Sequence, residues 1–191
     1  MEIERMAIPD LLLLKPRMFG DRRGFFLESY RREELLAFGA DVEFVQDNWS
    51  GSRYGVLRGL HYQLPAPQAK LVRAIRGEIY DLAVDIRVGS PWFGKFCGVR
   101  LSEENYLAHF IPEGFAHGFY VLSGYAEVMY KCSDYYRPEY SRGIAWNDPA
   151  IGVDWPIENG GVPVLSDRDK EHSMLADISE DILPKYRPAA S

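Results

Sequence analysis

The chain has 191 residues, 47% of them hydrophobic and 14% aromatic, enough to fill the core of one domain over residues 1–191. Its 28 acidic and 22 basic residues give a net charge of −6, which argues against nucleic-acid binding but allows a local cationic pocket. The longest early apolar run, Leu11–Leu14, is too short for a signal peptide or membrane span. Cys97 and Cys132 form no recognisable metal or disulfide framework, so we expect a soluble cytoplasmic protein.

The predicted elements are one helix and many short strands. Residues 29–39 predict the helix, with Gly39 as its stop. Residues 78–87 alternate as a strand, and residues 70–76 lead into them through Gly77, which predicts a hairpin. Residues 108–123 predict two strands around a Pro-x-Gly turn, and residues 125–136 predict another strand. The tail from about residue 160 is loop-like, with a short helical stretch near residues 171–176. Short strands separated by turns favour a β-sandwich or barrel.

Polar side chains gather in this strand-rich sequence. The segment "RGLHYQ" contains Arg58, His61 and Gln63, and Lys70 follows nine positions after His61. Asp81 lies on the less apolar face of its strand. Taken alone, a histidine in a strand is typically a core residue with one hydrogen bond. In a β-shell, however, alternate residues of several strands point into one interior, so these groups can converge in a pocket.

A metal centre is not favoured by the histidine spacing. Cupin barrels that bind a metal carry H-x-H-x(3,4)-E and P-x-G-x-x-H motifs. The chain has the second motif, with Pro112, Gly114 and His117. It lacks the first, because His61 is followed by Tyr62 and Gln63 and not by x-His, and no suitably spaced glutamate follows. Two histidines without a carboxylate are a poor transition-metal set. We therefore expect no metal. A metal-free pocket of His, Lys, Tyr and carboxylate suits proton transfer beside a carbonyl.

Six segments together resemble the dTDP-4-dehydrorhamnose 3,5-epimerase family, in that family's order: "GVLRGLHYQ", "QAKLVRAIRGEIYDLAVDIRVGSPWFGK", "LSEENYLAHFIPEGFAHGF", "AEVMYKCSDYY", "GIAWNDPAIGVDWP" and "VLSDRD". The resemblance implies a mostly-β, cupin-type jelly-roll β-barrel with a few short helices. It also implies a homodimer without metal or cofactor. The substrate would be a dTDP-4-keto-6-deoxyhexose, dTDP-4-dehydro-6-deoxy-D-glucose, inverted at C3 and C5.

The same resemblance assigns roles to individual residues. His61 would be the general base, Asp169 its paired carboxylate and Tyr130 the proton donor. Lys70 would lie near the keto oxygen, and Asp81 would be a further acidic catalytic residue. The implied binding residues are Arg23, Glu28, Gln46, Asp47, Asn48, Arg58, His117, Tyr136 for thymine, and Arg168 for phosphate. Some N-terminal residues are expected to reach the neighbouring subunit's site.

Several positions depart from the family pattern. Ser141 stands where a glutamate contact to the nucleotide is common, and Arg168 replaces a lysine but should still pair with phosphate. Trp49 and Trp92 also differ, which indicates either drift in packing or an altered sugar preference. On a regular strand Arg58 and His61 face opposite ways, so both reach one ligand only if Gly59 marks a bulge or twist.

Four other functions remain open at this point. The nearest is a 3-epimerase of the same fold that inverts one carbon, followed by a ketoisomerase acting on the same nucleotide sugar. A non-catalytic nucleotide-sugar-binding cupin would not need both His61 and Tyr130. A metal-dependent cupin oxygenase fits least, because the first metal motif is missing.

Overall fold

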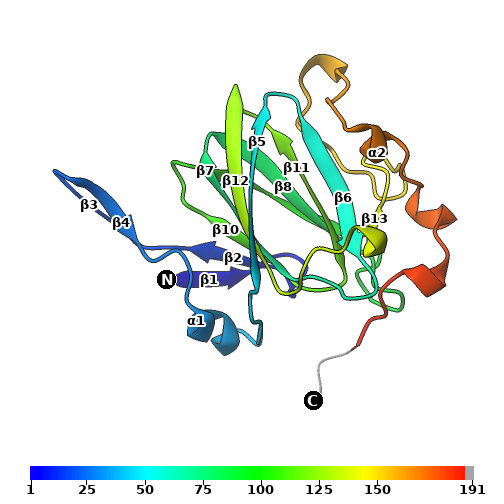
Figure 1. The fold of residues 1–191 in the computed structure, drawn as a ribbon, viewed down its shortest axis with the longest axis horizontal. Coiled ribbons are helices and arrows are strands. Elements are labelled where there is room, and N and C mark those ends of the chain that lie inside the picture. The colour runs from blue at the N-terminus through cyan, green and yellow to red at the C-terminus, as the bar shows by residue number, and fades with distance from the viewer. Residues whose placement is uncertain (188–191) are drawn as a thin grey trace.

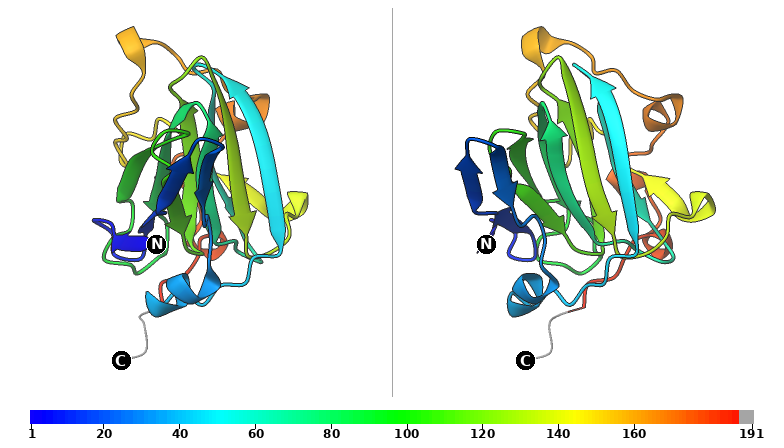
Figure 2. Two further views of the ribbon diagram at one scale, coloured as in Figure 1. Left: turned by 90° about the vertical axis from the view of Figure 1, so that its left-hand side faces the viewer. Right: turned by 60° about the vertical axis from the view of Figure 1, so that its left-hand side comes forward.

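The computed structural model describes residues 1–187, so the last four residues of the expected domain lie outside the described part. Two antiparallel sheets pack face to face (Figures 1 and 2). The first has the strand order β1 (Glu2–Arg5), β2 (Leu12–Lys15), β10 (Ala108–Ile111), β7 (Lys70–Arg76), β12 (Tyr125–Cys132) and β5 (Gln46–Arg53). The second has the order β13 (Ser141–Gly143), β6 (Leu57–Gln63), β11 (Phe115–Val121), β8 (Glu78–Asp85) and β9 (Phe96–Ser102). The mostly-β prediction is confirmed, with two open sheets in place of one closed ring.

The helices are short and lie at the edges of this sandwich. They are α1 (Arg32–Ala37), α2 (Asp167–Lys170) and the 3₁₀ turns η1 (Pro138–Tyr140), η2 (Glu158–Gly160), η3 (Leu175–Asp177) and η4 (Glu180–Ile182). The predicted helix over 29–39 is therefore real but shorter, and Gly39 follows it with a φ of +85°. In the tail, the helical stretch expected near residues 171–176 was misplaced, because α2 comes earlier and η3 only begins at Leu175. Within residues 1–187, no helix is both long and apolar enough to cross a membrane.

Strand β8 shows why its sequence alternates so regularly. Ile79 and Ala83 point into the core between the two sheets, next to Val72 of β7. The alternate residues, including Leu82 and Val84, pack against the chain that follows β13. That C-terminal part, yellow through orange to red in Figure 1, covers the outer face of the second sheet. Both faces of β8 are thus buried, so the buried carboxylate of Asp81, between Ile79 and Ala83 on the same face, needs polar partners.

The hairpin predicted at Gly77 is wrong. Strand β7 pairs with β10 and β12 in the first sheet, whereas β8 pairs with β11 and β9 in the second. Gly77 turns the chain from one sheet to the other, with a φ of +69° that suits glycine. A glycine between two strands signals a turn, but it does not say which sheet the second strand joins. The strands on either side of the Pro-x-Gly turn, β10 and β11, likewise lie in different sheets.

A bulge in β6 explains how Arg58 and His61 can face the same way, although they would face opposite ways on a regular strand. The register of β6 against β11 shifts between these two residues, so Gly59 and Leu60 together face the single residue Gly118. Gly59 has a φ of +129°, and a Cβ atom there would lie 2.6 Å from the Gly118 Cα. Only glycine fits this close approach. The bulge turns Arg58 and His61 toward the same cavity.

Candidate active site

A cavity of about 580 Å³ lies between the sheets and collects most of the predicted site residues. The first sheet contributes Gln46, Asn48, Lys70 and Tyr130, and the second contributes Arg58, His61 and His117. The α2 helix adds Arg168 and Asp169, and the loop after β12 adds Tyr136. Two sheets and a helix therefore bring together residues that are up to 123 positions apart, from Gln46 to Asp169.

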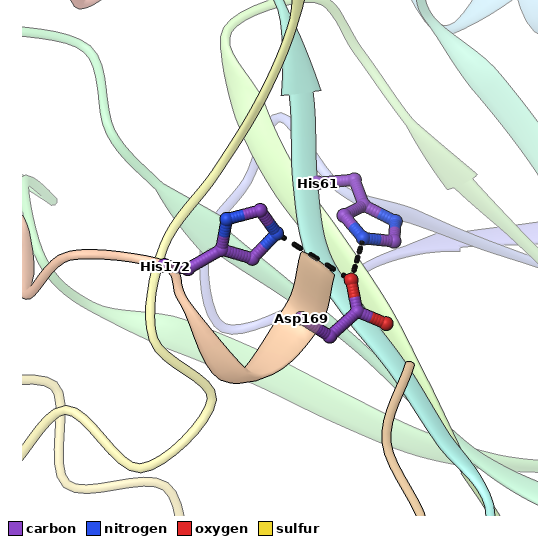
Figure 3. Close-up of side chains that lie close together, drawn as sticks. All are labelled: His61, Asp169 and His172. Atoms are coloured by element: carbon purple, nitrogen blue, oxygen red, sulfur yellow. Dashed lines mark hydrogen bonds and ion pairs between the residues drawn. The ribbon is translucent and has the colours of Figure 1, made fainter. Parts of the chain in front are cut away.

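His61 and Asp169 form a tight pair at the cavity wall. The His61 Nε2 atom lies 2.6 Å from Asp169 Oδ1, and the aspartate side chain is only 5% exposed (Figure 3). Ser166 caps α2, because its hydroxyl accepts a hydrogen bond from the Asp169 backbone N–H at 3.1 Å. Burial alone would raise the pKa of Asp169, but the imidazoles of His172 and His61 hold that pKa well below its ordinary value. Asp169 is thus ionised near neutral pH.

The ionised partner fixes the state of the His61 ring. A carboxylate can only accept hydrogen bonds, so the hydrogen sits on Nε2 and the lone pair on Nδ1. Burial lowers the pKa of His61, and Asp169 opposes this without reversing it. The ring keeps 36% of its side-chain surface accessible, and it lines the cavity. A neutral imidazole with an accessible lone pair is suited to accept a proton.

Lys70 and Tyr130 line the cavity from the opposite sheet. Lys70 begins β7, and burial lowers the pKa of its ammonium group, with Cys132 and Asp81 opposing that shift. Tyr130 lies in β12 beside Asn48 of β5, and burial raises the pKa of its phenol. The phenol therefore remains protonated far above neutral pH and is able to donate a proton. The ammonium group supplies a positive charge that can stabilise an oxyanion.

Asp81 lies behind the cavity wall and not on it. Its two carboxylate oxygens lie 2.7 Å from His117 Nε2 and 2.8 Å from His109 Nδ1, and all three side chains are buried. Of the three, only His117 lines the cavity. Asp81 was expected in the catalytic set, but its geometry is that of a residue that holds His117 in place. The sequence had given no role to His109, which lies on β10 opposite Val72 of β7.

An aromatic ring and two arginines surround the cavity mouth. The backbone N–H of Tyr136 donates to Gln46 Oε1 at 2.8 Å, which fixes the loop that carries the ring. Arg168 donates to the Ser141 carbonyl at 2.8 Å and lies 3.4 Å from the Tyr136 hydroxyl. Arg58, which donates to Ser52 Oγ at 3.0 Å, lines the same cavity. A planar ring and guanidinium groups in one cavity suit a nucleotide base with its phosphates.

Three of the expected binding residues do not line this cavity. Asp47 pairs with Lys131 at 3.0 Å, and Glu28 pairs with Arg31. Arg23 pairs with Asp21 on the hairpin formed by β3 (Met18–Asp21) and β4 (Gly24–Leu27). That hairpin projects from the sandwich, away from the cavity-facing α2 helix (Figure 1). The structure of the single chain therefore leaves Arg23, Glu28 and Asp47 outside this cavity.

His172 joins the site without having been expected there. Its Nε2 lies 3.4 Å from Asp169 Oδ1, and its ring packs edge-on against His61 with the ring centroids 5.7 Å apart. His172 follows Asp169 by three positions, the spacing that places two residues on one side of a helical turn. That spacing was the available signal, but it becomes informative only once Asp169 is known to be buried beside His61.

The fold and these residues define a class of protein: a cupin-like β-sandwich that carries a proton-transfer site. Over residues 5–177 the sequence matches the family model described as dTDP-4-dehydrorhamnose 3,5-epimerase, and the chain belongs to that family. It is 54% identical over 178 residues to the dTDP-4-dehydrorhamnose 3,5-epimerase of Pseudomonas aeruginosa, covering 93% of this chain and 97% of the relative.

Solved structures agree with this assignment. The Legionella pneumophila epimerase RmlC, in complex with dTDP-4-keto-L-rhamnose, is 47% identical, with a TM-score of 0.94 over 98% of this chain and 99% of that one. ChmJ, a 3′-monoepimerase from Streptomyces bikiniensis in complex with dTDP-quinovose, is 34% identical. Its TM-score is 0.88 over 95% of this chain and 92% of that one. The predicted family and the cupin-like fold are thus confirmed.

Proposed function

We propose that the protein converts dTDP-4-dehydro-6-deoxy-D-glucose to dTDP-4-dehydro-L-rhamnose by inverting C3 and C5. The observation that carries this proposal is the placement of the His61–Asp169 pair and Tyr130 on facing walls of one cavity. Inversion needs a base on one face of a carbon and an acid on the other. The family membership supports the choice of substrate.

The first half of each inversion is proton removal. The 4-keto group acidifies the hydrogens on both neighbouring carbons, C3 and C5. His61 takes one of them on Nδ1, and Asp169 stabilises the imidazolium that forms. The electron pair of the broken C–H bond moves onto the keto oxygen, where the ammonium group of Lys70 stabilises the enolate.

The second half is proton return from the opposite wall. Tyr130 donates its phenolic proton to the same carbon, and the enolate collapses back to the ketone with inverted configuration. His61 then releases its proton and Tyr130 regains one, so the pair is reset for the other carbon. No hydride moves in either inversion, so the reaction calls for no redox cofactor.

The cavity mouth is proposed to hold the nucleotide. Tyr136 is 49% exposed, which leaves its ring face free for stacking on thymine. Arg58 and Arg168 would bind the diphosphate, and the Ser141 carbonyl holds Arg168 for that purpose. Gln46 and Asn48 line the same cavity and offer amide groups to the substrate.

We further propose a homodimer in which the β3–β4 hairpin reaches the neighbouring subunit. This hairpin exposes Met18, Phe19, Phe25 and Phe26, each between 45% and 71% exposed. Beside it, a hollow of about 510 Å³ is lined by Leu71 and Ile75 of β7 and Met129 of β12, among others. Apolar surface of this kind marks a protein interface. A partner's hairpin would bring Arg23 to a site that lacks it within one subunit.

A cytoplasmic location is also proposed. Cys97 and Cys132 are both free and buried, which is consistent with a reducing compartment. The proposed substrate, a nucleotide sugar, fits the same location.

Incubation with dTDP-4-dehydro-6-deoxy-D-glucose in D2O, followed by NMR, tests the proposed function. We expect deuterium at both C3 and C5, and an L-rhamno product after a coupled reductase step. The similarity to ChmJ favours one second candidate, a 3-epimerase, which would place deuterium at C3 alone. Exchange at neither carbon despite tight binding of the nucleotide would instead indicate a binding protein. His61→Asn serves as the control that blocks exchange.

A further inference from the structure

Three potential metal ligands converge beside the cavity. The donor atoms of His61, Asp169 and His172 all lie within 4.8 Å of one another (Figure 3). They come from two separate parts of the fold, since His61 lies on β6 and the other two belong to α2 and the residues just after it. Two imidazole nitrogens and one carboxylate oxygen form a ligand set that zinc commonly takes in proteins.

His172 is the residue that turns this pair into a possible metal site. Its side chain is 10% exposed, and among the described residues its buried Nε2 has no hydrogen-bond partner. The contact with Asp169 Oδ1, at 3.4 Å, lacks hydrogen-bond geometry although the atom is aimed at the cluster. Gly143 leaves room for the ring, because a Cβ atom there would lie 2.1 Å from Nε2. A buried nitrogen without a partner is costly unless something binds to it.

Two of the three ligand separations are already close to those of a zinc site. Zinc bonds of about 2.0–2.1 Å in a tetrahedron place two ligand atoms about 3.3 Å apart. The separation of His172 Nε2 and Asp169 Oδ1 already matches this value at 3.4 Å. The His61 Nε2 and Asp169 Oδ1 atoms, now 2.6 Å apart, must separate by less than 1 Å. The fourth position would open into the cavity, which His61 lines.

We propose that His61, Asp169 and His172 bind a zinc ion, and that this binding switches off proton transfer. The inhibitory part rests on the proposed role of His61 as the base. A zinc ion on Nε2 takes the position of the hydrogen that His61 now directs at Asp169. The neutral ring then carries its hydrogen on Nδ1 and has no lone pair left there to accept a proton from the sugar. The ion therefore inhibits the reaction and has no part in it.

Calorimetry with zinc sulfate and purified, chelator-treated full-length protein tests the binding directly. We expect one zinc ion per chain, and Co²⁺ in its place should give the absorption bands of a four-coordinate site. His172→Gln removes one ligand and should weaken zinc binding by at least about 100-fold, since losing even an outer partner of a metal site costs roughly 10–100-fold. Cys132 lines the same cavity and carries a thiol that could bind zinc, but it is not among the proposed ligands. Cys132→Ser should therefore leave zinc affinity unchanged.

Activity gives the second reading. Zinc should inhibit the parent enzyme in competition with the sugar nucleotide, and a chelator should restore full turnover. For His172→Gln, the rate with zinc is compared with the rate of the same variant without zinc. The zinc concentration that halves this rate should be higher than for the parent by the same factor by which zinc binding is weakened. Zinc binding that is unchanged in His172→Gln, or no binding to the parent, would overturn the proposed metal site. Tight, His172-dependent binding without inhibition would overturn the tautomer argument instead. Neither result would affect D2O exchange by the zinc-free enzyme, so this proposal can fail independently of the proposed function.

Discussion

His61 and Tyr130 line one cavity from opposite sheets, His61 from β6 and Tyr130 from β12. The two residues are 69 positions apart in the sequence, and the strands that carry them do not pair with each other. The packing of the two sheets, and not any local motif, therefore sets which side of a bound sugar each residue meets. A base and an acid on facing walls are the arrangement that inversion of a carbon requires.

Tyr136 provides a test of nucleotide binding. Tyr136→Ala should weaken dTDP binding by about 1–3 kcal/mol, because stacking of a base on an aromatic ring contributes that much. The neighbouring Tyr135 is the matched control: it is 58% exposed and is not among the residues that line the cavity. Calorimetry should show normal dTDP affinity for Tyr135→Ala. Equal affinities for the two variants would remove Tyr136 from the binding site.

The rate should fall at alkaline pH because of Lys70. Burial lowers the pKa of Lys70 from its ordinary value of 10.5, whereas burial raises the pKa of Tyr130 above its ordinary value of 10.0. As the pH rises, Lys70 therefore tends to lose its charge before Tyr130 loses its proton, and enolate stabilisation falls through the lowered pKa of Lys70. An arginine stays charged throughout this range. The pH profile of kcat for Lys70→Arg should keep its alkaline limb at higher pH than the parent, whatever its absolute rate. An unmoved limb would assign this titration to another group.

The bulge at Gly59 links the fold to the site. Gly59→Ala adds a Cβ atom 2.6 Å from the Gly118 Cα at a φ of +129°, so we expect a loss of about 1–3 kcal/mol in the free energy of unfolding. Because the bulge orients Arg58 and His61, kcat should fall as well, by up to about 10²-fold for a displacement near 1 Å. Denaturant unfolding and steady-state kinetics measure both effects.

Gly124→Ala is the control for this substitution, since in the described part of the chain no atom beyond Gly124 and its two chain neighbours lies within 4 Å of the added Cβ. It should leave stability and rate close to those of the parent. If Gly59→Ala behaves in the same way as Gly124→Ala, the bulge does not position the site.

Much of the fold could be read from local patterns. The strand alternation at residues 78–87 and the strands over residues 108–123 and 125–136 were predicted because side-chain direction repeats every two residues. The partner of each strand was not predictable in this way, and the false hairpin at Gly77 shows why. A turn residue reports the local backbone, whereas pairing depends on which edges of which sheet remain free.

Site residues could be predicted only where they lie in segments that match the family in its order. The motif around Asp169 suggested its pairing with His61, and the structure places them 2.6 Å apart although 108 positions separate them. Asp81 was expected at the substrate, but its carboxylate is used by two buried histidines. His172 lies outside the six matching segments, and His109 lies inside one of them but was given no role there. The roles of both follow only from three-dimensional contacts. A contact with a residue of another element leaves no trace in the local sequence pattern unless a known motif records it.

Proton exchange and inversion, measured separately in D2O for Tyr130→Phe, test the central claim most directly. His61 should still remove the proton in this variant, and the enolate should be reprotonated on the face from which the proton left. We therefore predict that Tyr130→Phe keeps most of the deuterium exchange but loses most of the inversion. His61→Asn should lose both, on the order of 10²–10⁴-fold for a missing general base. Equal loss of exchange and inversion in Tyr130→Phe, or near-normal turnover in His61→Asn, would contradict the two-wall mechanism.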